Sequence, residues 1–392
     1  MRYSLLSKEY YKDRQHYEQL YQQRFENEST LHLSMSINGT QAFMTYPPEL
    51  LELVAKIYKG DKILSEKLHR LPELASLQFM KKCLVEEIQL TNEIEGVHST
   101  HKEICEVLHS KEKGKRLYGI VCKYNMLRQG IEIPMMSCGD IRSLYDDLVL
   151  PEVLEEDVRN VPDGIIFRKD SVSVQGADLQ IVHTGINPEE QIISYMDQCI
   201  RLIQNGEING LISIALVHYF IGYIHPFYDG NGRLVRFISS YLLTKELNPI
   251  VAFHLSYVIK KELKEYHKSF KITNEKKNRG DVTPFVIMFL NFVLQAVNSL
   301  NKIIDSKTEQ FSYYQENVKE VTNDPRLYRM LYILILNTLF GDEGIDVDKI
   351  AQLLNMSTPS VRKYIASVDK SVLWIGKSGH KNIYNLNLEY FN

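Results

Sequence analysis

One short segment, His225 to Arg236, constrains the fold of this chain more than any other part of the sequence. It fits the pattern H-x-F-x-D-G-N-G-R-x-x-R, and at average residue frequencies a chance match is expected on the order of once in 10¹⁰ windows. An apolar run from Leu211 to Ile224 precedes it, and a second helical pattern from Leu234 to Leu247 follows. The segment is therefore predicted to be a glycine-rich loop between two helices, the first of them buried.

The middle of this segment has the composition of an anion site. Gly230 and Gly232 have no Cβ, so backbone N–H groups around Asn231 can converge, and the following helix adds its unpaired N-terminal N–H groups. Such a cradle suits a phosphate. Arg233 and Arg236 come on the first turn of that helix, where guanidinium groups can make bidentate contacts with outer phosphate oxygens.

Two further side chains of the segment carry reactive chemistry. Asp229 can hold a Mg²⁺ or Mn²⁺ ion that bridges phosphates, since such an ion needs only one or two protein oxygens. His225 lies just upstream, where a neutral imidazole can take the proton from an attacking hydroxyl. The residues of the loop therefore predict transfer of a nucleotidyl or phosphoryl group to a hydroxyl.

Composition narrows the class of protein. With 392 residues, of which 44 % are hydrophobic, the chain is expected to form two or three domains with apolar cores. A net charge of −3 gives the whole molecule no general attraction to nucleic acid or anionic membranes. Five scattered cysteines, a charged N-terminus and the presence of His218 in the longest apolar run predict a cytoplasmic protein without a disulfide framework, signal peptide or membrane partner.

The elements expected along the chain predict a mainly α fold. Residues 71–108 have apolar positions near helical spacing and are expected to continue as helix. The predicted domains are a mostly helical N-terminal region at 1–80, a helical core at 81–300, a connecting helix at 301–325 and a C-terminal domain at 326–392.

One β-hairpin is predicted inside this helical core. Residues 165–168 and 171–174 have strand-like patterns, 175–178 supply a turn, and 179–182 can return as the second strand. The sequence Asn-Pro-Glu-Glu at 187–190 then has the residue types of a helix start, with asparagine as the cap and proline in the first helical position.

The C-terminal domain has the element order of a winged helix-turn-helix. Two helices at 347–354 and 358–368 are followed by a hairpin whose turn is predicted at 376–379. Between residues 358 and 381 lie one anion, Asp369, and five cations: Arg362, Lys363, Lys370, Lys377 and Lys381. This local charge suits contacts with DNA phosphates, but such a domain serves equally well in dimerisation or target docking, so both alternatives stay open.

The 225–236 segment resembles the signature motif of the Fic (filamentation induced by cAMP) family, and the resemblance extends over about Cys83 to Val297. Members typically transfer AMP from ATP to Tyr, Thr or Ser hydroxyls of target proteins. By position, the resemblance implies these roles: His225 as general base, Asp229 as Mg²⁺ ligand, Gly230, Asn231 and Gly232 as the cradle of the α- and β-phosphates, Arg233 on the outer phosphates, Arg236 on the γ-phosphate, and Phe227 as a buried anchor. The glycine at 232 favours AMP transfer, because the related Doc kinases carry lysine there.

Three other segments resemble parts of the same family. The stretch from Thr91 to Gly96 resembles its inhibitory helix, which implies that Glu95, with Thr91, pairs with Arg236 and denies it to the γ-phosphate. Residues 164–182 resemble the flap, which implies that a target segment docks over 167–182 as an added strand. Tyr266 corresponds to a residue that contacts adenine, although the tyrosine that often follows it is histidine here.

The resemblance therefore implies a protein adenylyltransferase that uses ATP and a divalent cation and is restrained by Glu95. Self-modification and homodimer formation remain open. The alternatives are removal of AMP from a modified protein with the help of Glu95, and an ATP-sensing regulator that binds DNA through residues 358–381. At the level of single residues, Glu95 has the alternative of an ordinary surface carboxylate, and His218 is expected to satisfy a buried carbonyl rather than to perform chemistry.

Overall fold

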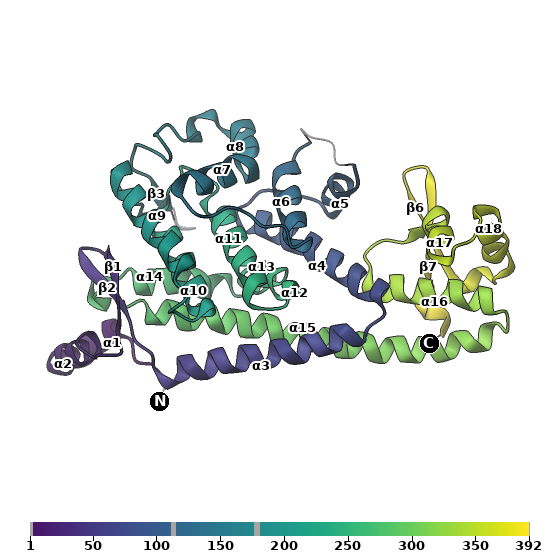
Figure 1. Ribbon diagram of the computed structural model, residues 1–392, viewed down its shortest axis with the longest axis horizontal. Helices are drawn as coiled ribbons and strands as arrows, with labels where there is room; N and C mark the ends of the chain where they lie inside the picture. Colours follow the sequence, from purple (N-terminus) through teal and green to yellow (C-terminus); the bar gives the residue numbers. More distant parts are fainter. Residues whose placement is uncertain (1–2, 111–114, 176–180, 392) are drawn as a thin grey trace. The chain divides into compact units, whose positions relative to one another are not determined.

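The computed structural model describes residues 3–110, 115–175 and 181–391, and these confirm the mainly α fold (Figure 1). The chain forms two compact units: unit 1 comprises Met1–Asp61 and Leu84–Asn298, and unit 2 comprises Lys62–Cys83 and Ser299–Asn392. The domain limits predicted at 80/81 and 300/301 fall inside two continuous helices, α4 (Glu73–Ile94) and α15 (Thr283–Val321). Helical periodicity has no break at these positions, so it carries no signal for the division into units.

The N-terminal part of unit 1 contains a hairpin where the sequence pattern predicts mostly helix. Its elements are α1 (Leu6–Lys12), α2 (Arg14–Phe25), β1 (Leu31–Ile37), β2 (Thr40–Met44) and α3 (Pro48–Arg70), of which the last continues into unit 2. The two strands pair antiparallel around Asn38 and Gly39, whose φ angles are 50° and 80°. Asn-Gly accepts two successive positive φ angles, as a two-residue hairpin turn requires.

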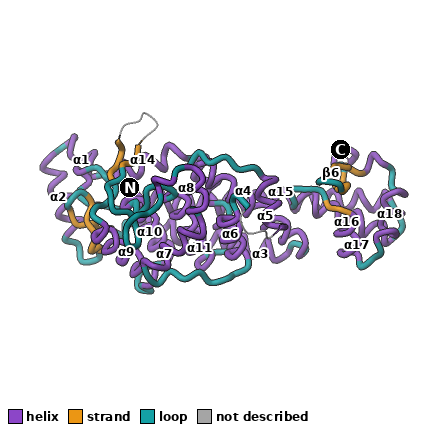
Figure 2. Tube along the Cα trace, turned by 90° about the horizontal axis from the view of Figure 1, so that it is seen from above, coloured by secondary structure: helices purple, strands orange, loops and turns teal. Residues whose placement is uncertain are grey.

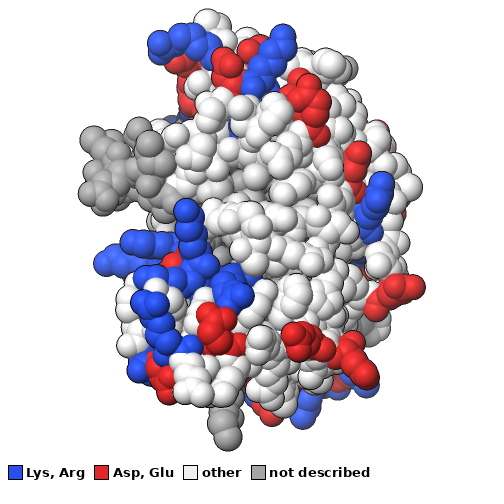
Figure 3. All heavy atoms as spheres, turned by 90° about the vertical axis from the view of Figure 1, so that its left-hand side faces the viewer, with Lys and Arg blue, Asp and Glu red and all other residues white. Residues whose placement is uncertain are grey.

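Tyrosine rings of this N-terminal region lie against basic side chains of residues 277 and 279, which follow α14 in the sequence. Figure 3 shows Lys and Arg gathered on one side of the face it draws. The guanidinium carbon of Arg279 lies 3.6 Å from the centre of the Tyr21 ring, and the Lys277 ammonium lies 4.5 Å from that of Tyr10. Such cation–π contacts hold part of the basic surface in place.

The core of unit 1 is built around α10 (Gly210–Ile224), which is buried on nearly every side. It packs against α9 (Glu189–Gln204) and α11 (Asn231–Glu246) (Figure 1). A helix that is apolar all round requires such neighbours. Because α10 ends at residue 224 and α11 begins at residue 231, the glycine-rich segment forms the loop between them, as predicted.

Short helices surround this core. They are α5 (His101–Ser110), α6 (Tyr118–Arg128), α7 (Cys138–Leu148), α8 (Leu150–Glu156), α12 (Pro249–Ala252), α13 (Leu255–Lys261) and α14 (Leu263–Thr273). The single helix predicted over 71–108 is instead divided into α4 and α5. Gly96 has a φ of 77°, the left-handed conformation that commonly ends a helix.

The predicted hairpin of the core is shorter than expected. It consists of β3 (Ser173–Gln175) and β4 (Ile181–Thr184), drawn as strands in Figure 2. Most of the predicted turn lies outside the described residues. The strand predicted at 165–168 is instead a series of bends, and Pro188 is the N-cap of α9 rather than its first residue.

Unit 2 contains the C-terminal elements in the predicted order. They are α16 (Pro325–Phe340), β5 (Ile345–Asp346), α17 (Val347–Leu354), α18 (Thr358–Ser367), β6 (Leu373–Ser378) and β7 (Lys381–Leu386), with the strands arranged β5-β7-β6. The turn lies at 379–380 rather than at 376–379, because Gly379 adopts a φ of 58°. Lys381, one of the predicted DNA-contacting cations, pairs with Asp346 at 3.0 Å and Asp348 at 2.8 Å, so part of the basic charge is neutralised internally.

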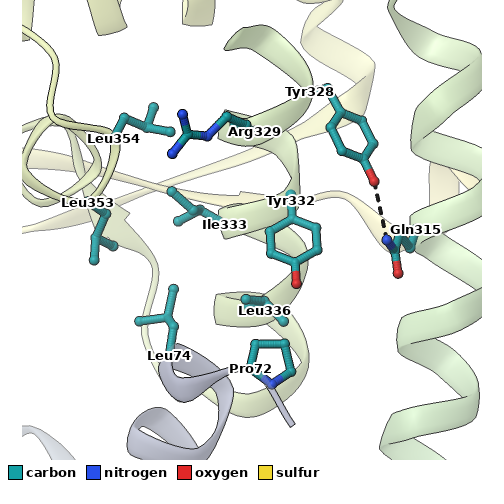
Figure 4. Close-up of a pocket in the computed structure, with 10 residues that line it drawn as sticks. All are labelled: Pro72, Leu74, Gln315, Tyr328, Arg329, Tyr332, Ile333, Leu336, Leu353 and Leu354. Carbon is teal, nitrogen blue, oxygen red and sulfur yellow. Dashed lines mark hydrogen bonds between the residues drawn. The ribbon is translucent and has the colours of Figure 1, made fainter. Parts of the chain in front are cut away.

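An apolar pocket of about 440 Å³ also lies in unit 2 (Figure 4). Leucines from α4, α16 and α17 line it, and at one side Gln315 Nε2 donates a hydrogen bond of 3.3 Å to the Tyr328 hydroxyl. None of the residues predicted to bind or transform a nucleotide lines this pocket. The candidate catalytic residues all belong to unit 1.

By length and composition alone, one helix among the described residues could cross a membrane. This is α15, which contains an 18-residue window of mean hydropathy 1.5. Of that window, 67 % is buried inside the protein. Burial of this kind is what a core helix of a folded domain requires.

Candidate active site

The loop between α10 and α11 begins at His225, which has left-handed backbone angles (φ 53°, ψ 63°). Its N–H donates to the Ile221 carbonyl and closes the last turn of α10. Gly230, with a φ of 76°, lies directly before the first residue of α11. The predicted base and the predicted anion cradle therefore occupy the two ends of one tight loop. The unpaired backbone N–H groups at the start of α11 are the candidate donors of this cradle.

The loop is closed on itself by Asn231. Its side-chain oxygen accepts from the Phe227 N–H at 3.0 Å, and its amide nitrogen donates to the Phe227 carbonyl at 2.8 Å. The Phe227 ring is fully buried and stacks on Tyr145 at a centroid distance of 3.6 Å, with Phe167 edge-on at 5.4 Å. The side chain of Asn231, predicted to cradle phosphate, thus shapes the loop, which leaves backbone N–H groups as the candidate cradle.

Neighbouring side chains occupy the space where two glycines of the loop would carry a Cβ. A Cβ at Gly230 would lie 2.4 Å from Val149 Cγ1, in a backbone conformation that L-residues rarely adopt. A Cβ at Gly232 would lie 2.0 Å from the Glu95 carboxylate. That carboxylate therefore lies against the backbone of the loop, where the sequence predicts a phosphate oxygen.

Arg236 is held entirely by α4 and the turn that ends it. Its Nη1 donates to Glu95 Oε1 at 2.7 Å, its Nε donates to the Thr91 hydroxyl at 2.7 Å, and its Nη2 donates to the Thr91 carbonyl at 2.8 Å. Burial would raise the pKa of Glu95, but Arg236 and then Arg233 outweigh it and hold that pKa below the usual value. All three nitrogens of Arg236 thus donate to Glu95 or Thr91, and the inhibitory role of these two residues stays a prediction.

Arg233 has a partner that the sequence did not suggest. Its Nη1 pairs with Glu152 Oε2 at 2.5 Å, and both side chains are almost completely buried. Glu152 lies in the first turn of α8, far from the loop in sequence and outside any recognisable motif. Its contact with Arg233 follows from packing alone. Unlike Arg236, Arg233 keeps one buried nitrogen, Nε, without a hydrogen-bond partner among the described residues.

His225 has the electrostatics of a neutral base. Burial lowers its pKa to about 4, with further contributions from His183 and Arg168. The imidazole is therefore uncharged at neutral pH and can accept a proton. Its backbone is fixed by Arg168, whose Nε donates to the His225 carbonyl at 2.9 Å.

Arg168 is a second residue that sequence reasoning did not assign to the site. It is fully buried, and its guanidinium donates to the carbonyls of Asp170, Ile186, Ile224 and His225. No carboxylate pairs with it within the described residues. It therefore ties the base of the hairpin to the end of α10. This arrangement needs contacts across three separate segments, which local sequence patterns do not reveal.

The same hairpin base is held by Glu189, in the first turn of α9. Its carboxylate accepts from the N–H groups of residues 165, 166 and 167 at distances between 2.8 and 3.0 Å. These bonds curve residues 165–168 into bends, so the predicted strand does not form. Glu189 therefore stabilises the base of the hairpin.

Asp229 is partly exposed beside the cradle. One carboxylate oxygen accepts from the Gly230 N–H at 2.5 Å, and the Asp229 carbonyl accepts from the Tyr145 hydroxyl at 3.2 Å. The second carboxylate oxygen has no hydrogen-bond donor in the described part of the chain. A single carboxylate oxygen beside a phosphate site fits the requirements of Mg²⁺, which takes its other ligands from phosphates and water.

Tyr266, predicted to contact adenine, is buried in the core. Its hydroxyl shares a hydrogen bond of 2.7 Å with His218 Nε2, and the other imidazole nitrogen bonds the Ser239 hydroxyl at 2.7 Å. Burial lowers the pKa of His218 to about 3. His218 is structural, as expected, although hydroxyl groups rather than a carbonyl satisfy it. The adenine contact of Tyr266 stays a prediction, since its polar atom is already bonded.

Comparison with known proteins identifies the domain. Residues 138–243 match the model of the Fic/DOC family, so the chain contains a Fic/DOC domain. A protein named "Protein adenylyltransferase Fic" from Drosophila mojavensis is 27 % identical over 175 residues, which cover 42 % of this chain and 32 % of that protein. The protein of the same name from Drosophila erecta is 39 % identical over 127 residues, or 32 % of this chain and 22 % of that protein. The match thus spans a third or less of the length of these relatives.

A solved structure shows the same fold. The crystal structure of a Fic family protein from Desulfovibrio desulfuricans G20 superposes with a TM-score of 0.51 and 19 % sequence identity. The superposition covers 87 % of this chain and 97 % of that one. The similarity therefore concerns the arrangement of the helices over most of the chain, beyond the residues that match the family model.

Proposed function

We propose that this Fic/DOC domain transfers AMP from ATP to a hydroxyl group of a protein and that Glu95 of the same chain restrains the reaction. The observation that carries the proposal is the position of the Glu95 carboxylate. It lies against Gly232 in the anion cradle and pairs with Arg236 at 2.7 Å. A site that attracts a carboxylate of its own chain has the shape and charge to attract a phosphate oxygen.

In the proposed reaction, His225 takes the proton from the target hydroxyl while the hydroxyl oxygen attacks the α-phosphorus of ATP. The new O–P bond forms as the bond between the α-phosphorus and the bridging oxygen breaks, and pyrophosphate leaves with the electron pair. The low pKa of His225, caused mainly by burial, keeps the imidazole ready to accept this proton at neutral pH. The N–H groups at the start of α11 and the two arginines stabilise the charge that develops on the phosphates.

Asp229 would hold the divalent cation. One of its carboxylate oxygens accepts no hydrogen bond from the described residues, and a bound Mg²⁺ would neutralise charge on the triphosphate. The protein target would dock on the hairpin of β3 and β4. These two strands form a two-stranded sheet within the described residues, so each has an edge to which an extended segment could add.

The nature of the transferred group tests the proposal. The Glu95→Gly variant is incubated with cell lysate and Mg²⁺, in parallel with ATP labelled at the α-phosphate and with ATP labelled at the γ-phosphate. We expect protein-bound label from the α-labelled nucleotide alone, because AMP transfer retains only that phosphorus. Label from the γ-position would indicate a kinase, and label from neither would contradict the proposal.

The position of Glu95 beside the cradle also favours the reverse reaction as a second candidate. A carboxylate that lies at Gly232 and influences the pKa of His225 could hold a water molecule there. If wild-type chain releases AMP from the α-labelled products and Glu95→Gln chain does not, removal of AMP is the function of the restrained state.

A further inference from the structure

The two arginines of the phosphate loop are held in different ways. Both are almost completely buried, with 1 % exposure of each, and each pairs with one carboxylate. Arg236 pairs with Glu95 and Arg233 pairs with Glu152. If both carboxylates had the same task, Glu152 would be a second inhibitory residue. The hydrogen bonds of the two guanidinium groups argue for different tasks.

Each of the three nitrogens of Arg236 already donates a hydrogen bond to α4 or to the turn that ends it. Its Nε, Nη1 and Nη2 atoms all donate to Thr91 or Glu95, at distances of 2.7 and 2.8 Å. A phosphate that pairs with this guanidinium competes with the Glu95 carboxylate, which already pairs with Nη1 at 2.7 Å. The contact with Glu95 therefore opposes binding of the triphosphate.

Arg233 is only partly engaged. Glu152 binds its Nη1 atom, while the buried Nε atom has no hydrogen-bond partner among the described residues. An unpaired buried N–H is unfavourable in a folded protein and usually has an explanation, such as a ligand. The Nε edge of a guanidinium is one of the edges that accepts two oxygens of a phosphate.

Glu152 also belongs to the segment from α7 to α8 that packs against the loop. It follows Val149, whose side chain would collide with any Cβ at Gly230, and the preceding helix carries Tyr145, which bonds the Asp229 carbonyl. The segment from α7 to α8 thus fixes the loop backbone and the Arg233 side chain together. An anchor of this kind sets the direction of the free edge of Arg233.

We infer that Glu152 is a positioning residue: it holds Nη1 of Arg233 so that the free Nε edge faces an outer phosphate of the nucleotide, and it does not compete with that phosphate. This inference rests on the proposed function. It assigns the inhibition to Glu95 and Thr91 alone. The Glu95 carboxylate then competes with a phosphate for Arg236, whereas the Glu152 carboxylate orients Arg233 toward a phosphate.

Binding of ATP, ADP and AMP to purified full-length chains, measured by calorimetry with Mg²⁺, tests this assignment. In the Glu95→Gly background, Glu152→Gln is expected to weaken the binding of ATP and of ADP by about 10-fold or more, because the charge-assisted contact between Arg233 and an outer phosphate loses its alignment. AMP binding is expected to stay unchanged, because AMP has no outer phosphate. In the wild-type background, Glu152→Gln is expected to give no gain in ATP binding. Glu155→Gln, an exposed change on the same helix, is the matched control.

The outcomes separate this inference from the proposed function. Tighter ATP binding by Glu152→Gln would make Glu152 a second inhibitor, and equal weakening of all three nucleotides would make it merely structural; either overturns the inference. If the Glu95→Gly chain binds ATP and Glu152→Gln does not change that affinity, the inference is overturned and the proposed function is not. If the Glu95→Gly chain binds no nucleotide, the proposed function fails and the inference with it. Thermal melting checks folding, and if Glu152→Gln does not fold, Glu152→Asp is expected to give a smaller, ATP- and ADP-specific weakening.

Discussion

Replacing Glu95 by glycine is expected to raise the rate of AMP transfer about 10- to 100-fold, which is the effect of one charge-assisted hydrogen bond of about 1.5–3 kcal/mol. The change removes the bond to Arg236 Nη1 and clears the space beside Gly232. It leaves the two bonds from Arg236 to Thr91 in place, so release of Arg236 still requires movement of its side chain or of α4. The rate is measured as incorporation of α-phosphate label into protein.

Two control variants separate loss of the carboxylate from damage to the helix. Glu93→Gly places a glycine in the last turn of the same helix without touching Arg236, and we expect no activation from it. Glu95→Gln keeps the size of the side chain and removes its charge, so an intermediate rate is expected. Equal rates for wild type and Glu95→Gly, with the variant folded, would remove Glu95 from the inhibitory role.

Replacing His225 by alanine in the Glu95→Gly background is expected to lower label transfer by about 10²- to 10⁴-fold, the usual contribution of a general base. ATP binding should change little, because the cradle consists of the N–H groups of α11 and of Arg233 and Arg236. His98→Ala, at an exposed position, is the matched control. Loss of ATP binding together with activity would instead indicate that His225 supports the loop structurally.

The pH profile of the Glu95→Gly variant gives an independent check of the same role. The pKa of His225 is lowered to about 4, mainly by burial, so the neutral imidazole persists down to mildly acidic pH. The rate is therefore expected to stay level as pH decreases toward 5 and to fall as pH passes through about 4. A fall centred near the ordinary histidine pKa of about 6.5 would show that the imidazole is solvated when it reacts.

Much of the central site could be predicted from sequence because its residues are close together in the chain. The apolar run of α10, the glycine-rich segment and the amphipathic start of α11 fix the loop within a few residues, and the run itself reveals its burial. The role of Asn231 was harder to predict. A side-chain amide next to a phosphate site can bind a ligand or the backbone, and only the folded loop shows that it bonds Phe227.

The site residues that the sequence did not reveal contact partners that are far away along the chain. Glu152 meets Arg233, and Arg168 meets the carbonyl of His225, through packing of separate helices and the hairpin base. Neither carries a local pattern that distinguishes it from a surface charge. The burial of these charged side chains is visible only in the folded structure. A charged group that is buried requires partners, and packing brings those partners together.

Two other differences concern secondary structure. The hairpin of β1 and β2 has a turn signal, Asn38-Gly39, that is visible in the sequence and outweighs the helical tendency of its surroundings. By contrast, the bends at 165–168 depend on the carboxylate of Glu189, which lies more than twenty residues further along the chain. The β1–β2 hairpin was predictable from its turn, whereas the bends at 165–168 could be recognised only from the tertiary contact with Glu189.

The decisive experiment is a crystal structure of the Glu95→Gly variant with ATP and Mg²⁺. We expect the triphosphate to lie on the N–H groups at the start of α11, with Arg236 turned from Thr91 to the terminal phosphate and the Nε edge of Arg233 on an outer phosphate. Nucleotide bound elsewhere in the molecule, or a loop without nucleotide and with Arg236 still bonded to Thr91, would contradict this expectation.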